Sequence, residues 1–163
     1  MFTTQNLTLF LAVLLSALIA GLFYGYSCSV NPGLGRLADV EYLKAMQSIN
    51  RAILNPVFFM SFMGTLIVLP ICTWLKYTEP PSSGFYFLLS ASVLYGIGVF
   101  GVTMIGNVPL NEMLDAFDIR SSTASEVSTH RERFERLWNT YHQIRTVSSI
   151  TVLALVILSI LKK

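Results

Sequence analysis

Three long stretches of this chain contain no charged residue. They cover residues 7–30, 56–75 and 85–105. A helix needs roughly 20 mostly apolar residues to cross the hydrocarbon core of a bilayer, which is about 30 Å thick, so each stretch is long enough to span a membrane. The sequence therefore predicts an integral membrane protein with several spans.

A fourth apolar stretch, residues 146–161, is shorter than the other three. The residues before it, from about Ser128, follow a helical pattern that would supply further turns and begin in the membrane interface. The expected fold class is all-α: a four-helix integral membrane bundle that forms a single transmembrane domain over residues 1–163. The predicted spans lie near residues 7–30, 56–75, 85–106 and 130–161.

The composition agrees with a chain divided into membrane spans. Hydrophobic residues make up 53% and charged residues only 12% of the 163 residues, whereas an ordinary soluble domain carries about 25% charged residues. The net charge of +2 comes without a basic run or an interleaved aromatic patch, which excludes nucleic acid as a partner. Membrane lipids are the expected surroundings, in the inner or plasma membrane if the chain is bacterial.

The connections between the spans carry local structure signals. The segment Asn31-Pro32-Gly33 is typical of a turn that ends the first span. Residues 39–54 repeat apolar side chains at helical spacing, which predicts an amphipathic interfacial helix with Asp39 as its N-cap. Asn55 and Pro56 then fit a capping residue and a first helical proline, which begin the second span.

Small residues recur every four positions in the first span. They are Ala17, Gly21, Gly25 and Ser29. Because residues at this spacing share one helix face, a neighbouring helix could approach that face closely. We therefore predict a packing seam along the first span.

Basic residues gather in two of the connections. Residues 31–55 hold three and residues 107–145 hold five of the eleven lysines and arginines. Cytoplasmic connections carry an excess of these residues. This side of the bundle is therefore predicted to face the cytoplasm, with both termini outside.

One stripe of the last helix carries candidate site residues. Trp138, His142 and Arg145 follow Phe134 at offsets of four, eight and eleven, which places all of them along one helix face. Polar residues at membrane depth usually face the interior of a bundle and mark a site. Taken singly, Arg145 could instead reach lipid head groups, and Trp138 could belong to an interfacial aromatic belt.

The end of the third span carries a matching stripe. Asn107 and Asn111 follow Thr103 at four-residue spacing. Between them, Pro109 removes a backbone hydrogen bond and is expected to unwind the helix, which would free carbonyl groups.

Two further amides are expected on the same membrane face. Asn31 follows the first span and Asn50 lies on the interfacial helix. With the two asparagines of the third span they could form a ring that, together with His142 and Arg145, binds a planar oxygenated molecule. The alternative is that these asparagines only cap helix ends and join loops.

Other chemistries have little support in the sequence. His130 and His142 lie twelve residues apart and at different angles on a helix, which is not a metal-binding spacing. The chain contains no phosphate-binding loop, no dinucleotide glycine motif and no nucleophile elbow. We therefore predict no metal and no cofactor. The charge-free spans also argue against a proton pump or an ion-coupled transporter built on buried carboxylates.

Several strings of residues together resemble one known family. They are N-P-G at residues 31–33, M-Q-S-I-N at 46–50, T-M-I-G-N-V-P-L-N at 103–111 and W-N-T-Y-H-Q-I-R at 138–145. This combination is similar to the anthrone-oxygenase-like family of small membrane proteins, and the resemblance covers almost the whole chain. Named fungal members oxidise polyketide anthrones to anthraquinones with molecular oxygen and no known metal or flavin. The resemblance implies that the site residues are Asn107, Asn111, Trp138, His142 and Arg145.

Two functions follow from these observations. The first is a cofactor-independent oxidoreductase for a lipophilic phenol, anthrone or quinone, in which His142 is the base and Arg145 with the amides stabilises the phenolate. The second is a non-catalytic binding or accessory subunit of a membrane complex, whose small-residue faces would contact other subunits or a second copy. A carrier for a lipid or small molecule is a third candidate. These functions predict different surroundings for the stripe of the last helix: it either lines a pocket or points at lipid or at a partner.

Overall fold

The computed structural model describes residues 3–78 and 80–162, and all regular structure in this part of the chain is helical. Helical segments that follow one another directly form continuous rods. The first rod contains α1 (Thr4–Gly25), the π-helical segment η1 (Tyr26–Val30) and α2 (Asn31–Leu34), and the helices α3 (Asp39–Ala52) and α4 (Pro56–Lys76) follow. The remaining elements are α5 (Ser83–Leu94), η2 (Tyr95–Gly101), η3 (Thr103–Asn107), α6 (Val108–Asp115) and α7 (Ala124–Leu161).

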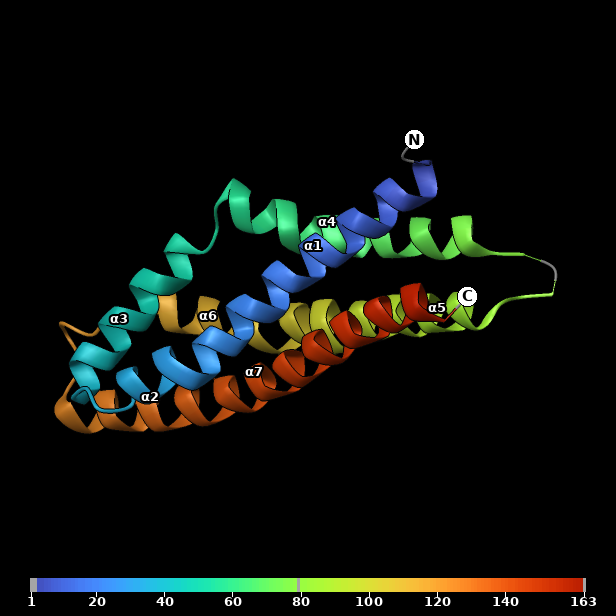
Figure 1. Ribbon diagram of the computed structural model, residues 1–163. Helices are drawn as coiled ribbons and strands as arrows, with labels where there is room; N and C mark the ends of the chain where they lie inside the picture. The colour runs from blue at the N-terminus through green and yellow to red at the C-terminus, as the bar shows by residue number, and fades with distance from the viewer. Residues whose placement is uncertain (1–2, 79, 163) are drawn as a thin grey trace.

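Four helical rods are long and apolar enough to cross a membrane. They cover Thr4–Leu34, Pro56–Lys76, Ser83–Asp115 and Ala124–Leu161, so the predicted helical membrane bundle is confirmed. In Figure 1 both termini and the connection between α4 and α5 lie at one end, whereas α2, α3 and the start of α7 lie at the other. The rods therefore run alternately up and down.

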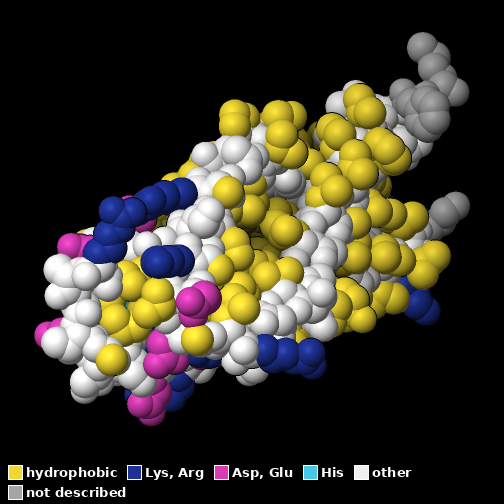
Figure 2. All heavy atoms as spheres, turned by 90° about the vertical axis from the view of Figure 1, so that its left-hand side faces the viewer, with side chains coloured by type: hydrophobic (Ala, Val, Ile, Leu, Met, Phe, Trp, Pro, Cys, Tyr) yellow, Lys and Arg dark blue, Asp and Glu magenta, His cyan; other side chains and the backbone are white. Residues whose placement is uncertain are grey.

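Charged and hydrophobic side chains lie on different parts of the surface. Figure 2 views the molecule from the end that carries α3 and the start of α7. Most of the Lys, Arg, Asp and Glu side chains in this view lie on its left and lower part, whereas hydrophobic side chains, mixed with backbone and other side chains, cover much of the rest. This division is the one expected when the middle of a bundle contacts lipid and one end contacts water.

Two predicted helix breaks are wrong. The turn at Asn31-Pro32-Gly33 is helical, and the helix does not unwind at Pro109. In both places a π-helical segment precedes the proline: the N–H of Asn31 donates to the carbonyl of Tyr26, and the N–H of Val108 to that of Thr103. Proline lacks an N–H and crowds the carbonyl four residues earlier, and a wider turn with bonds to the fifth residue back accommodates it. The first and third rods are therefore longer than predicted.

The interfacial helix is observed as α3, with one correction at its start. Its N-cap is Ala38, and Asp39 is instead the first helical residue, where its negative charge interacts favourably with the helix dipole. The start of α4 agrees with the prediction, because the Asn55 side chain accepts a hydrogen bond from the N–H of Phe58 at 3.0 Å and Pro56 is the first helical residue. The cap pattern in the sequence therefore predicted the start of α4 correctly, whereas it placed the N-cap of α3 one residue too late.

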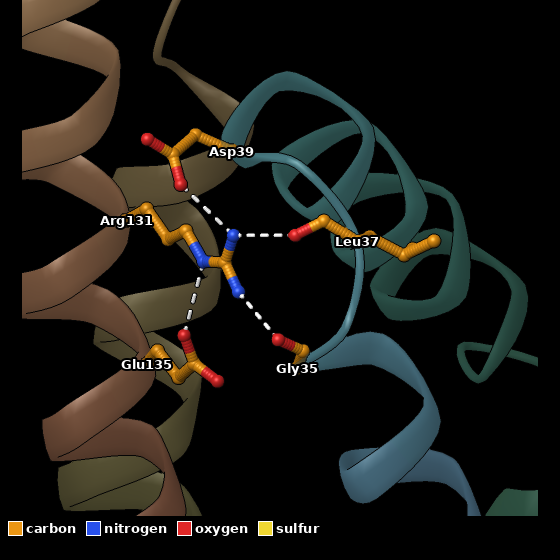
Figure 3. Close-up of polar contacts among 5 residues, drawn as sticks. All are labelled: Gly35, Leu37, Asp39, Arg131 and Glu135. Carbon is orange, nitrogen blue, oxygen red and sulfur yellow. Dashed lines mark hydrogen bonds and ion pairs between the residues drawn. The ribbon is translucent and has the colours of Figure 1, made fainter.

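A single arginine of α7 anchors the connection between α2 and α3 (Figure 3). Arg131 donates through Nη1 to the Leu37 carbonyl at 2.7 Å and to Asp39 at 2.8 Å, and through Nη2 to the Gly35 carbonyl at 3.1 Å. Its Nε donates to Glu135 on the next turn of α7. These bonds fix the start of α3 against the last helix, so α3 is held in place where it covers the interior of the bundle.

The Arg131 guanidinium also lies over the ring of Tyr42, 4.5 Å from its centroid. Tyr42 is buried between α3 and α7. Burial, reinforced by Glu135, raises the pKa of the Tyr42 phenol well above its ordinary value, although Arg131 opposes this change. The phenol therefore stays neutral, and this contact does not change charge near neutral pH.

The packing seam predicted on the first span is not formed at its two glycines. A Cβ added at Gly21 or Gly25 would meet no atom within 4 Å, so at these positions the helix contacts no neighbouring helix in the described residues. The close approaches involve the third rod: a Cβ at Gly98 would lie 2.5 Å from the Ser148 hydroxyl, and one at Gly106 would lie 2.6 Å from the Tyr141 ring. Four-residue spacing shows that residues share a face but does not show which face meets a neighbour.

These contacts predict opposite outcomes for two glycine substitutions. Gly106→Leu should lower the stability of the folded bundle by about 1–3 kcal/mol, because the new side chain overpacks against Tyr141. Gly21→Leu should leave stability nearly unchanged. Thermal melting of both variants in the same detergent checks this expectation, and equal melting temperatures for the two variants would contradict the packing described above.

Candidate functional site

The candidate stripe of α7 faces a cavity inside the bundle. This cavity has a volume of about 130 Å³ and lies between the first rod, α3, α4, the third rod and α7. Its walls are largely aromatic and aliphatic, with few polar groups. The aromatic residues are Phe23, Tyr26, Phe58, Phe59, Phe62 and Trp138, and the polar ones are Asn50, Thr103, Asn111, His142 and Arg145.

Arg145 is the charged group of this cavity. Its side chain is buried, with 8% exposure, and its guanidinium lies between the rings of Phe23 at 4.5 Å and Trp138 at 5.0 Å. The ion pairs of the described residues all lie elsewhere, so no carboxylate of this part of the chain neutralises Arg145. A buried charge without a counter-charge is costly, and for this reason Arg145 is a candidate site residue.

His142 lies next to Arg145 and is almost fully buried, with 1% exposure. The Nε and Nη2 atoms of Arg145 lie 3.3 and 3.2 Å from His142 Nδ1. A guanidinium has only donors, so Nδ1 must be the acceptor, and the imidazole is neutral with its proton on Nε2. The ring stacks on Trp138, with centroids 5.0 Å apart and planes at 18°. His142 therefore presents a lone pair on the edge that faces Arg145.

Two of the four predicted amides line the cavity. Asn111 accepts a hydrogen bond from Trp138 Nε1 at 2.9 Å, which orients the indole. Asn50 also lines the cavity, and its buried Nδ2 has no hydrogen-bond partner in the described residues. Both therefore lie where a bound molecule would contact them.

The other two amides do not line the cavity. Asn31 donates to the Asn139 side chain at 2.8 Å and ties the end of the first rod to α7. Asn107 is buried and donates to the backbone carbonyl of Trp138 at 3.3 Å. Thr103, four residues earlier on the same rod, reaches the cavity instead. The predicted ring of four amides is therefore not formed.

Sequence reasoning missed the contribution of the first rod. Phe23 and Tyr26 line the cavity, and Ser27 bonds to His142 with its Oγ 2.9 Å from Nε2. Tyr26 and Ser27 follow Phe23 at offsets of three and four, which is a signal for a shared face.

The geometry defines what the cavity can bind. Aromatic walls favour a flat apolar molecule, since rings pack well on rings. The guanidinium favours an oxygen that carries negative charge, because such hydrogen bonds are the strong ones. The described residues contain no cluster of three or more His, Cys, Asp or Glu side chains that could hold a metal ion. The aromatic walls and the buried guanidinium are therefore the features that a ligand of this cavity would contact.

Comparison with curated proteins and with solved structures gave no significant match. The family model described as anthrone oxygenase matches residues 57–155. This region is more than half of the chain and contains the third rod, Trp138, His142 and Arg145. Ser27 and α3 lie outside it. The chain therefore belongs to the anthrone oxygenase family, as its resemblance predicted.

Proposed function

We propose that this protein oxidises a lipophilic anthrone or related phenol with molecular oxygen, without a metal or flavin. One observation carries the proposal: Arg145 is buried beside His142 at an aromatic-lined cavity, and no carboxylate in the described residues pairs with it. A substrate that becomes an oxyanion would supply the missing negative charge. The family of the chain supports an oxygenase-like activity.

The cavity suits a substrate that arrives through the membrane. Leu54, Phe59 and Met104 line the cavity and are also exposed on the surface of the bundle. An apolar rim offers no barrier to a flat hydrophobic molecule that is dissolved in the bilayer. The ring system would lie among the aromatic walls, and the oxygen attached to it would point toward Arg145.

The chemistry begins with removal of a proton. His142 Nδ1 takes a proton from the ring CH₂ of the substrate, and the hydrogen bonds of Arg145 pass from Nδ1 to the oxyanion that forms. The electron-rich anion gives an electron to O₂, and the two radicals combine to form a peroxide anion at the same carbon. The proton held by His142 then passes to this anion and gives a hydroperoxide. This intermediate loses water. The CH₂ group thus becomes a carbonyl with one oxygen atom of O₂, and the other oxygen atom leaves as water.

The test measures the O₂ that is consumed and the quinone that is formed. Purified protein in detergent or lipid nanodiscs is supplied with anthrone, and O₂ consumption is recorded together with anthraquinone absorbance. One O₂ should disappear per quinone formed, faster than autoxidation, and with no effect of a metal chelator. Labelled ¹⁸O₂ should place one labelled atom in the quinone. Tight binding of anthrone without turnover would contradict the oxygenase proposal and favour the non-catalytic binding subunit.

A further inference from the structure

We propose that Ser27 is a positioning residue for His142. Ser27 lies in η1 on the first rod, and its Oγ lies 2.9 Å from His142 Nε2. By accepting the Nε2 proton, it holds the imidazole with the lone pair on Nδ1, toward Arg145 and the cavity. The consequence for turnover rests on the proposed function, whereas the positioning itself does not.

The direction of each hydrogen bond follows from the donors available. Arg145 can only donate, so Nδ1 of His142 is an acceptor and Nε2 carries the proton. Of the two hydroxyl oxygens near Nε2, Ser27 Oγ is the closer, and Thr146 Oγ1 lies farther away at 3.4 Å. Ser27 therefore accepts from Nε2.

The hydroxyl protons agree with this assignment. Thr146 donates its own proton to the backbone carbonyl of His142 at 2.7 Å, so its oxygen is free to accept. Ser27 lies 3.3 Å from that oxygen and can donate to it. Each hydroxyl then donates once, and a lone pair of Ser27 remains directed at Nε2.

The aromatic contacts of the imidazole cannot replace these bonds. Trp138, Tyr26 and Phe23 surround the ring at centroid distances of 5.0, 5.3 and 5.9 Å. Such contacts hold the plane of the ring but are nearly the same if it turns over, which would exchange Nδ1 with a carbon. Only hydrogen bonds to the ring nitrogens distinguish the two edges.

Ser27 matters most when Arg145 leaves Nδ1. In the resting site both groups fix the ring, one at each nitrogen. When the guanidinium turns to a substrate oxyanion, Ser27 is the side chain from another helix that still bonds to a ring nitrogen, because Thr146 lies on α7 with His142 itself. It then keeps the lone pair in place for the substrate proton. The charged or titratable side chains that face the imidazole are Arg145 and Tyr26.

The experiment determines the tautomer of the His142 imidazole directly, by ¹⁵N NMR. The chain has only two histidines, so ¹⁵N-histidine labelling with a His130→Gln variant assigns the signals of His142. Wild-type protein should show the neutral form with a proton on Nε2. Because Arg145 holds Nδ1 as an acceptor in the resting site, the serine is tested in Arg145→Met protein. There Ser27→Ala should add a population with the proton on Nδ1, and Ser27→Thr, which keeps the hydroxyl, should not. Ser29→Ala, an exposed serine in the same segment, should change nothing.

The rate of anthrone turnover should change in parallel with the tautomer of His142. Ser27→Ala should lower kcat about tenfold with KM nearly unchanged, as expected for a group that orients another, and Ser27→Thr should restore most of it. A wild-type proton on Nδ1, or a His142 spectrum that Ser27→Ala leaves unaltered in Arg145→Met protein, would overturn the proposal. If Ser27→Ala does not fold, Ser27→Cys, a weak acceptor of similar size, replaces it. If no variant turns over anthrone, the spectra still decide the role of Ser27, and the proposed function alone fails.

Discussion

Replacing Arg145 with methionine should lower the turnover of anthrone at least about a hundredfold, the loss expected when the main donor to a developing oxyanion is removed. It should not lower the melting temperature of the protein. Methionine fills a similar volume. His142 Nδ1 loses its donor, but this loss is offset because the variant no longer buries a charge that no carboxylate of the described residues neutralises. Activity and thermal stability are measured on the same preparation.

Two matched variants make this result specific. Arg145→Lys keeps the positive charge but loses the planar set of donors, so it should recover only part of the activity. Arg136→Met removes an exposed arginine from the same helix and should leave both measurements unchanged. A clear fall in melting temperature for Arg145→Met, with normal turnover in the folded fraction, would assign Arg145 a structural role instead.

Replacing His142 with glutamine should lower kcat by roughly 10²–10⁴, the range of general base catalysis, while KM changes little. The glutamine carbonyl can still accept from Arg145, but it cannot take a proton from the substrate. The measurement is the initial rate of quinone formation over a range of anthrone concentrations. Binding of anthraquinone, followed by its absorbance, reports whether the cavity is intact.

The second histidine of the chain is the control for this variant. His130 stacks on Phe117 near the start of α7 and does not line the cavity. His130→Gln should therefore keep full activity. If His142→Gln instead loses stability and substrate binding in parallel, with kcat preserved in the folded fraction, the histidine supports the structure and the base must be sought elsewhere.

Part of the site was accessible from the sequence because it lies on one helix. Trp138, His142 and Arg145 share a face of α7 by spacing alone, and a polar face at membrane depth must turn inward. Partners from other helices were harder to foresee. Asn107 and Asn31 are polar residues near the expected face, yet they bond to α7 outside the cavity.

The sequence by itself determined the number of spans, the interfacial helix and the cap at Asn55, because the length of an apolar stretch and the hydrogen bonds of a helix end are local properties. Only the tertiary structure decided how the prolines are accommodated, which glycines meet a neighbour, and that Ser27 reaches His142. These outcomes depend on where two helices cross and how each is rotated about its axis. A single helical pattern gives residues a common face, but it does not say what lies opposite that face.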